Sequence, residues 1–501
     1  MSLALQSLWS GPDLDAVHAA VQRLLEDVGV RVDSGAARDV LLSAGARELG
    51  GGRVSLPWPL VDHALQTLPP AFTLAARDAA RDVAVAHDAG RTWVHCFGEA
   101  PFVSDPRTGE VRRATARDQI LSARVAHHLQ YPEILNPIFS PGEVPGDLQP
   151  LISYFLLTAE TDKYVAGPGV STVAHVRAIH AMASLVVSAD AAAGRHPVQM
   201  SFSPVSPLAL GADIADALME AARLGVVCEL LPCPVAGTTA PASLSGALAQ
   251  ETAEALACCV LVQAAASGTP CIYGARLVAC DPRTGAFATG GPELGYCAVG
   301  AAALGRRYGL PADCYGLATD SKVVDVQWAL ERTVNALLGA MGRPALLSGV
   351  GLTQSGLAGC IDVLPLDDEI LARITWALRP ASTDEQRLDP AYLASGVTSG
   401  TGFLGVRETR HHMRREFFAP RLAFRGTLEQ WAAGGDRDLL DASAARAAQL
   451  AARDPVGLPD GTAADMAAVI ATAARDGGAA DAPDVRRLRE EALAPCDPES
   501  R

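Results

Sequence analysis

From about residue 130 onward, short apolar segments alternate with longer segments of helical periodicity, and this alternation constrains the fold more than any other feature. The centres of the apolar segments are roughly 30–40 residues apart, which suits one strand and one helix per repeat. Seven such units in series predict an α/β fold, and they favour a (β/α)8 TIM barrel. The predicted strands are Ile134–Phe139, Lys163–Gly169, Val198–Pro204, Val226–Pro234, Thr269–Arg276, Ala312–Thr319 and Ala345–Leu352.

A doubly wound open sheet is the alternative fold for the same alternation. No Gly-x-Gly-x-x-Gly opens a helix after the first predicted strand, which weakens the dinucleotide-binding version of that fold. The eighth unit of the barrel is expected beyond Leu364, where the pattern is less clear. Most predicted strands end in glycine or proline, as at Gly167-Pro168-Gly169. Strand ends form the active-site face of a barrel, although strand-to-helix turns favour these residues in any protein.

Two further regions flank the predicted barrel. We assign residues 1–129 to an N-terminal mixed α+β extension, residues 130–425 to the TIM-barrel catalytic domain, and residues 426–501 to an Ala-rich helical tail with a mobile end. Apolar residues recur at helical spacing between Leu14 and Val28, and short alternating segments such as Thr92–Cys96 predict strands in the extension.

The charge balance limits the partners of this chain. Its 501 residues contain 41 Lys and Arg against 56 Asp and Glu, a formal net charge of −15. This balance argues against a nucleic acid or an anionic membrane, because phosphate contacts need a cationic surface, and it permits a cationic small molecule. The eleven cysteines are scattered, which favours buried thiols in a reducing cytoplasm. We expect neither a signal peptide nor a transmembrane helix, because the N-terminal residues lack a basic region before a short apolar stretch and no run of about twenty apolar residues occurs.

Charged side chains near the predicted strand ends are the candidate reactive groups. The sequence has no Gly-x-Ser-x-Gly elbow, no Walker loop and no His-Glu-x-x-His motif, and we predict no metal site. Glu251, with Glu254 three residues later, lies near the start of a predicted helix and would place a negative field at the barrel mouth. His95 lies on a predicted strand beside Phe97 and Glu99, either as a core histidine or as a functional group.

Aromatic side chains at strand ends are a second group of candidates. Aromatic residues make up only 5% of the chain, yet several of them fall at predicted strand ends. Converging ring faces would form a box for a quaternary ammonium group through the ring quadrupole, whereas the alternative is that the rings plug the barrel. Arg276 and Lys322 lie nearby and would bind a substrate carboxylate. The aromatic candidates are Phe97, Phe202, Tyr273 and Tyr315.

Several sequence blocks occur together in a fixed order. They are Leu25–Val30, Ala100–Val103, Pro234–Pro241, Gly246–Gln250, Gly268–Gly274, Thr319–Lys322 with Asp325–Gln327 and Glu331, Gly349–Gly356 and Leu366–Glu369. In their number and order, these blocks resemble the trimethylamine methyltransferase (MttB) superfamily. The resemblance covers about residues 12–425.

The resemblance implies a TIM barrel that moves a methyl group from a methylated amine to the cobalt of a separate corrinoid protein. The founding branch uses trimethylamine and carries pyrrolysine at a position that falls near Cys314–Gly316, where this chain has only ordinary residues. The chain therefore resembles the non-pyrrolysine branch, whose substrates are quaternary amines such as glycine betaine. The resemblance also implies that this chain binds no cofactor itself, that a cognate corrinoid-binding protein supplies cobalamin, and that the protein is a cytoplasmic homo-oligomer.

The resemblance gives the candidate residues their expected roles. The four aromatic residues would enclose the cation, Glu99 or Glu251 would supply a negative field as catalytic residues, and His95, Arg276 or Lys322 would hold a substrate carboxylate. Two alternatives stay open. One is a methyltransferase of the same fold that uses another acceptor such as folate, and the other is a noncatalytic protein that binds quaternary amines.

Overall fold

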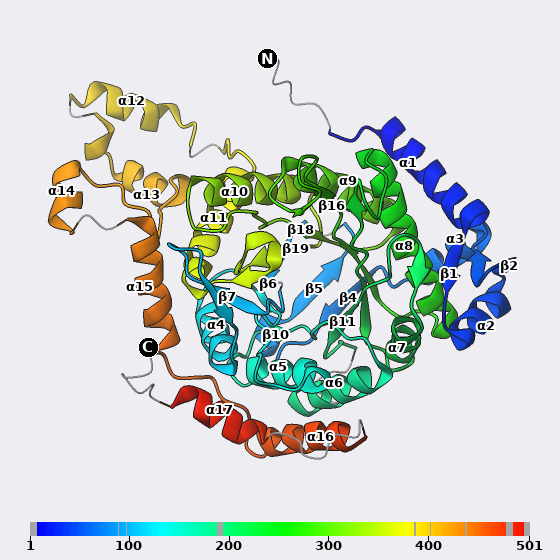
Figure 1. Ribbon diagram of the computed structural model, residues 1–501. Coiled ribbons are helices and arrows are strands. Elements are labelled where there is room, and N and C mark those ends of the chain that lie inside the picture. Colours follow the sequence, from blue (N-terminus) through cyan, green and yellow to red (C-terminus); the bar gives the residue numbers. More distant parts are fainter. Residues whose placement is uncertain are drawn as a thin grey trace.

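Eight parallel strands form the central sheet of the protein. The computed structural model describes residues 8–88, 90–96, 98–187, 194–384, 387–400, 402–435, 438–476 and 484–494. The strand order is β10-β9-β6-β19-β18-β15-β13-β11, and Figure 1 shows the curled sheet inside a ring of helices. The strands are β6 (Trp93–Cys96), β9 (Ile134–Leu135), β10 (Tyr164–Val165), β11 (Gln199–Phe202), β13 (Val227–Leu230), β15 (Cys271–Ala275), β18 (Ala312–Tyr315) and β19 (Leu346–Val350).

The two edge strands of this sheet, β10 and β11, approach each other just beyond the end of β10. The backbone N–H of Gly167 donates to the carbonyl oxygen of Gln199 at 2.8 Å, and Gly169 forms an isolated parallel bridge with Ser201. A Cβ at Gly167 would lie 2.7 Å from the carbonyl oxygen of Gln199, so this approach requires a residue without a side chain. The sheet is therefore strongly curled, and the carboxyl ends of its strands converge.

All seven predicted strand segments contain a strand of the sheet, but the eighth strand does not come from the expected place. We expected it beyond Leu364, where the structure has helix α11 (Leu364–Ala377). The strand is β6, from the segment assigned to the N-terminal extension, and it pairs with β9 and β19. Leu364, Leu371 and Ile374 recur at helical spacing and are buried, which explains why the later segment forms a helix.

Helices surround the outer face of the sheet. Helix α8 (Leu244–Ala265) is buried along most of its length, because three N-terminal helices pack against the side that faces away from the sheet. They are α1 (Gly11–Arg23), α2 (Gly35–Ala44) and α3 (Trp58–Gln66). Polar side chains begin several of these helices: Thr115 accepts the N–H of Asp118 at the start of α4, and Asp325 accepts that of Trp328 at the start of α10. The helices are α4 (Ala116–His128), α5 (Gln149–Thr158), α6 (Val173–Val186), α7 (Ala212–Arg223), α8 (Leu244–Ala265), α9 (Pro292–Tyr308), α10 (Val326–Met341) and α11 (Leu364–Ala377).

An antiparallel hairpin of β4 (Ala71–Leu74) and β5 (Val83–Ala86) covers the amino ends of the sheet strands. Its apolar side chains form one cluster with buried residues at the start of several strands. Figure 1 shows the hairpin within the ring of helices. Because apolar packing fills this end, a functional site is expected at the carboxyl ends of the strands. The cluster includes Phe72, Leu74, Val83, Val85, Ile134, Tyr164, Val227, Ile272 and Leu346.

The remaining N-terminal elements and several short strands form smaller sheets around the central one. β1 pairs with β3 and, in parallel, with β12 beyond β11. A second small sheet consists of β20, β21, β7 and β8 in that order, and β14, β16 and β17 form a third. These elements are α1 (Gly11–Arg23), β1 (Val30–Val32), α2 (Gly35–Ala44), β2 (Arg47–Gly50), β3 (Arg53–Ser55), α3 (Trp58–Gln66), β7 (Phe102–Ser104), β8 (Val111–Arg113), β12 (Ala209–Leu210), β14 (Val235–Ala236), β16 (Val278–Cys280), β17 (Phe287–Ala288), β20 (Leu352–Thr353) and β21 (Ala358–Gly359).

The C-terminal region is helical. Helix α15 packs against α4 and α11, and α16 packs against α6, so part of this tail lies along the outside of the ring (Figure 1). Arg489 of α17 donates to the buried carboxylate of Glu160 at 2.6 Å. The predicted mobile end beyond residue 494 lies outside the described residues. Within the described part of the chain, no helix is long and apolar enough to cross a membrane. These helices are α12 (Pro390–Thr398), α13 (Arg407–Glu416), α14 (Leu428–Ala433), α15 (Leu439–Ala451), α16 (Thr462–Asp476) and α17 (Val485–Leu493).

Candidate functional site

A cavity of about 300 Å³, which we call the strand-end cavity, lies where the carboxyl ends of β6, β9, β10 and β11 meet. A larger cavity of about 980 Å³ lies between α1 and the first turns of α8 and α9. We place the candidate site at the smaller cavity, because ligands of parallel α/β sheets bind at the carboxyl ends of the strands. Its wall consists of Gly98, Glu99, Asn136, Pro137, Gly167, Pro168, Gly169, Val170, Ser171, Ser201, Ser203, Ile214 and Leu231.

Glu99 is the one charged side chain among the described residues of this wall. Its φ of +58° lies in the left-handed region, which non-glycine residues seldom adopt, and such conformations cluster at functional sites. Hydrogen bonds from the Glu99 and Ala100 N–H groups to the carbonyl oxygens of Pro137 and Ile138 fix this segment beside the residues that follow β9. The backbone conformation is therefore held by the neighbouring strand.

The Glu99 carboxylate lies against a glycine-rich backbone. Its Oε1 accepts the backbone N–H of Gly169 at 3.2 Å. A Cβ at Gly169 would lie 3.1 Å from Glu99 Oε2, so a larger residue there would crowd the carboxylate. Burial, only partly offset by this one hydrogen bond, raises the pKa of Glu99 to about 7. Near neutral pH this group therefore exists in both protonation states, and its ionised form would favour a cation in the cavity.

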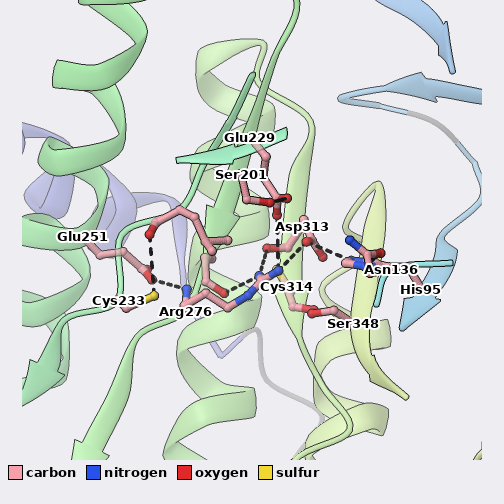
Figure 2. A network of polar contacts seen from close by, with 12 residues as sticks. His95, Asn136, Ser201, Glu229, Cys233, Glu251, Arg276, Asp313, Cys314 and Ser348 are labelled. Atoms are coloured by element: carbon pink, nitrogen blue, oxygen red, sulfur yellow. Dashed lines mark hydrogen bonds and ion pairs between the residues drawn. The ribbon is translucent and has the colours of Figure 1, made fainter. Parts of the chain in front are cut away.

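Beneath the cavity, six side chains form a buried polar network: His95, Asn136, Ser201, Glu229, Arg276 and Asp313 (Figure 2). The two ring nitrogens of His95 lie 3.0 Å from Asn136 Oδ1 and 2.9 Å from Asp313 Oδ2. Arg276 Nη2 donates to the same Asp313 oxygen at 2.5 Å and to Glu229 Oε1 at 3.3 Å. The members come from β6, β11, β13 and β18 and from the segments after β9 and β15, so only the folded sheet assembles them.

Two members of the network, Asn136 and Ser201, also line the strand-end cavity. Asn136 holds His95, and the Ser201 hydroxyl donates to Glu229 Oε2 at 2.5 Å. The network therefore meets the cavity through an amide and a hydroxyl, while its charged groups lie below. A ligand in the cavity would contact these neutral groups and feel the charges at longer range.

The charges of the network determine its protonation. Burial opposes ionisation of Asp313, but the positive charge of Arg276 and the hydrogen-bonded His95 outweigh it and hold the pKa of Asp313 well below its usual range. Burial likewise favours a neutral imidazole, but Asp313 raises the pKa of His95 above its ordinary value. Burial and the neighbouring charge of Asp313 raise the pKa of Glu229 to about 7. Asp313 is thus the fixed anion of the network, and Glu229 is the member that titrates near neutral pH.

Glu251 has a different environment from Glu99. This α8 residue is buried, and its Oε1 accepts the backbone N–H groups of Arg276 and Leu277 at 2.7 and 2.6 Å. Its Oε2 accepts the hydroxyl of Tyr273 at 3.0 Å. Burial raises the pKa of Glu251 to about 7 despite these donors. Glu251 therefore fixes the backbone turn that carries Arg276, and it does not line the strand-end cavity.

Comparison with known proteins identifies the family. The family model described as trimethylamine methyltransferase (MTTB) matches residues 3–478. The chain belongs to this family. Two relatives agree with this assignment. The trimethylamine methyltransferase MttB of Desulfitobacterium hafniense (strain DSM 10664 / DCB-2) is 27% identical over 470 residues, covering 92% of this chain and 93% of that protein. The glycine betaine methyltransferase of Desulfitobacterium hafniense (strain Y51) is 27% identical over 418 residues, covering 83% and 86%.

The MTTB-family chain is therefore a methyltransferase, as the family and both named relatives are. A solved structure, the monomethylamine methyltransferase MtmB of Methanosarcina barkeri, has the same general fold, with a TM-score of 0.52 at 12% identity over 88% of each chain. The hydroxylamine complex of MtmB gives the same TM-score over 89% of this chain and 90% of that chain. At this identity the likeness is one of fold.

In this MTTB-family protein, the predicted aromatic residues do not gather around the strand-end cavity. Phe202 and Tyr273 lie in the main apolar core, and Tyr273 bonds to Glu251. Tyr315 belongs to a separate apolar cluster. None of these three residues lines the cavity, and Phe97 lies outside the described residues. A role in binding the cation stays a prediction for Phe97. The other three rings pack in apolar clusters and do not line the cavity.

The predicted carboxylate-binding residues are likewise separated. Arg276 and His95 belong to the buried polar network and are 4% and 1% exposed. Lys322 is exposed, and its Nζ donates to the carbonyl oxygen of Asp320 at 2.9 Å. Of the predicted site residues that the structure describes, only Glu99 lines the strand-end cavity.

Sequence reasoning missed Asp313, Glu229, Asn136 and Ser201. Glu229 stands in the apolar strand Val227–Leu230, and Asp313 stands in Ala312–Tyr315. A lone carboxylate within an apolar strand is a usable signal, because a charge is seldom buried without a partner. Asn136 and Ser201 carry no comparable signal in the sequence.

Proposed function

We propose that this methyltransferase removes a methyl group from a small quaternary amine, such as glycine betaine or a similar compound, and passes it to the Co(I) of a corrinoid protein without using pyrrolysine. The observation that carries the proposal is the half-buried Glu99 carboxylate on a cavity wall whose other described residues are uncharged. An ionised carboxylate in such a site attracts a permanent cation. Membership of the MTTB family supports the chemistry, and a relative named for glycine betaine supports the substrate class.

The size of the site supports a small substrate and a separate cofactor carrier. The strand-end cavity, at about 300 Å³, lies at the small end of the range for ligand sites. A corrin ring is larger than this cavity, so the corrinoid would stay on its own protein and approach from the carboxyl ends of the strands. When bound there, the corrinoid would supply the Co(I) nucleophile that accepts the methyl group.

This chain would bind, orient and shield the amine. In the transfer, a C–N bond of the quaternary amine breaks, its electron pair stays on nitrogen, and the tertiary amine leaves neutral. The methyl group departs with the positive charge, so no side chain needs to donate a proton. Glu99 would hold the cation, Asn136 and Ser201 would contact it as neutral groups fixed by the buried polar network, and the apolar packing at the amino ends would exclude water.

We also propose that the curled sheet is a closed (β/α)8 barrel. The hydrogen bond between Gly167 and Gln199 and the sequential order of the strands from β6 support closure between β10 and β11. A cytoplasmic location is proposed with it. Ten cysteines in the described part of the chain carry free thiols, which suits a reducing compartment.

The test is methyl transfer observed through the cobalt. The protein is mixed with cob(I)alamin on a corrinoid-binding protein and with single methylated amines, and loss of the Co(I) absorbance is followed. We expect consumption of Co(I) with at least one quaternary amine, and a slower rate for Glu99→Gln. Glu48→Gln, a change at an exposed residue of β2, is the matched control and keeps the parent rate. Absence of transfer from every quaternary amine, with folded protein, would refute the proposal.

A further inference from the structure

The described wall of the strand-end cavity carries an acidic side chain that suits a positive charge and no basic side chain that would pair with a negative charge. Among the described residues of its wall, Glu99 is the only charged side chain, and the polar remainder consists of Asn136, Ser171, Ser201 and Ser203. Many methylated amines are zwitterions that carry a carboxylate as well as the ammonium group. A zwitterion needs a cationic or strongly donating partner for its carboxylate, because a buried unpaired charge is costly.

Arg276 does not supply that partner. Its Nη2 donates to Asp313 and Glu229, and its Nη1 donates to the carbonyl oxygens of Ala275 and Asp313 at 3.0 and 2.9 Å. The side chain is 3% exposed and does not line the cavity. To bind a substrate carboxylate, the guanidinium would have to leave two buried carboxylates, and breaking a buried ion pair is strongly unfavourable.

The other two predicted carboxylate-binding residues, His95 and Lys322, are also committed elsewhere. His95 uses one ring nitrogen for Asn136 and the other for Asp313, and the residue is 1% exposed. Lys322 is exposed, off the cavity wall, and bonded to the carbonyl oxygen of Asp320. Within the buried polar network, Arg276 and His95 face Asp313 and Glu229, so its positive charges are matched by carboxyl groups.

Two of the neutral donors of the wall are already engaged by carboxylates of the protein. The proton of Ser201 is directed to Glu229, and the backbone N–H of Gly169 is directed to Glu99. A carboxylate placed in a cavity of about 300 Å³ would lie close to the Glu99 carboxylate. Repulsion between these two carboxylates would weaken the binding of a zwitterion even where the rest of the molecule fits.

Resting on the proposed function, we infer that the substrate is a quaternary ammonium compound without a carboxylate, whose fourth substituent is alkyl or hydroxyalkyl. A hydroxyl group would find hydrogen-bond partners at Asn136 or Ser203 without meeting a repulsive charge. The relative named glycine betaine methyltransferase acts on a carboxylate-bearing amine. This chain would therefore differ in substrate specificity from a relative in the same family.

The test compares three probes that share the trimethylammonium group or its equivalent: tetramethylammonium, choline and glycine betaine. Their dissociation constants are measured by calorimetry near pH 8, about one unit above the pKa of Glu99. We expect glycine betaine to bind at least about tenfold more weakly than choline. Glu99→Gln should weaken choline binding and reduce the difference between the two, whereas Glu48→Gln should change neither.

A gain-of-function variant makes the test independent of loss of folding. Ser203→Arg adds a cation to the cavity wall and should improve glycine betaine binding relative to choline. Glycine betaine binding as tightly as choline to the parent protein would overturn the inference and leave the proposed function standing. Binding of none of the three probes would also overturn the inference, whereas the proposed function is overturned only if no quaternary amine supports methyl transfer.

Discussion

The Arg276 guanidinium lies 2.5 Å from the Asp313 carboxylate, and neither side chain is more than 3% exposed. This pair joins the turn after β15 to β18, and His95 extends it to β6. Both charges were removed from water during folding, so each now depends on the other for compensation. The pair thus anchors the floor beneath the strand-end cavity.

The first prediction concerns this pair. Arg276→Met leaves Asp313 buried without its main counter-charge, and we expect the free energy of unfolding to fall by about 3–5 kcal/mol. Denaturant titration measures the change. Adding Asp313→Asn to Arg276→Met should restore part of the loss, because the uncompensated charge is gone. Arg177→Gln, which breaks an exposed ion pair with Glu220, is the control and should leave stability almost unchanged. A loss no larger than that of the control would contradict the role given to the pair.

The second prediction concerns the pH dependence of cation binding. Because burial raises the pKa of Glu99 to about 7, the carboxylate loses its charge as the pH falls through that value. The affinity for tetramethylammonium should therefore be constant above about pH 8 and decrease by up to about tenfold per pH unit well below 7. Calorimetric titrations between pH 5.5 and 8.5 would measure it. Glu99→Gln should flatten the dependence, and a steep profile in that variant would assign the titration to another group.

The third prediction concerns protein stability and Glu251. Burial raises the pKa of Glu251 above its unfolded value, so the folded state binds its proton more tightly between about pH 4.5 and 7. In that window the unfolded state holds fewer protons, and the free energy of unfolding decreases as the pH rises, by up to about 1.4 kcal/mol per unit for one group. Glu251→Gln should remove this contribution. Denaturant titrations at several pH values would measure the free energy of unfolding, which should fall less steeply with pH in Glu251→Gln than in the parent. An unchanged slope would count against a titrating Glu251.

The fourth prediction concerns the approach of the two edge strands. A Cβ at Gly167 would lie 2.7 Å from the backbone oxygen of Gln199, an atom that cannot move aside freely. Gly167→Ala should cost about 1–3 kcal/mol of stability and lower methyl transfer, because Gly167 also lines the cavity. Gly146→Ala is the matched control, since a Cβ there meets no atom within 4 Å. Equal stability of the two variants would mean that the strands do not approach as described.

Part of the fold was readable because its signal is local. A strand buried on both faces is a short apolar run, and the seven predicted runs each contain a strand. The eighth strand, β6, was predicted as a strand at Thr92–Cys96, but we assigned this segment to the N-terminal extension and not to the central sheet. The four residues of β6 do not indicate that the strand pairs with β9 and β19, because sheet partners are set by long-range pairing.

Two of the sequence blocks that carry the family resemblance contain buried and part-buried contacts that stabilise the fold. Asp367 binds the fully buried Arg332, with Nη2 and Oδ2 2.5 Å apart, and accepts the N–H of Gly351. Glu331 accepts from the hydroxyl of Thr319 and the N–H of Asp320. Asp367 lies in the first turn of α11, where a carboxylate suits the helix dipole, and it forms this core ion pair in addition.

The sequence by itself determined the α/β class, the positions of seven strands and the family resemblance, because periodicity and motif order are properties of neighbouring residues. It also singled out Glu99, which follows a short predicted strand. Only the tertiary structure decided that Asp313, Arg276, Glu229 and His95 share one buried network while Tyr315 and Lys322 lie outside it. Burial and charge pairing depend on which strand ends converge, and that convergence is set by the curl of the whole sheet.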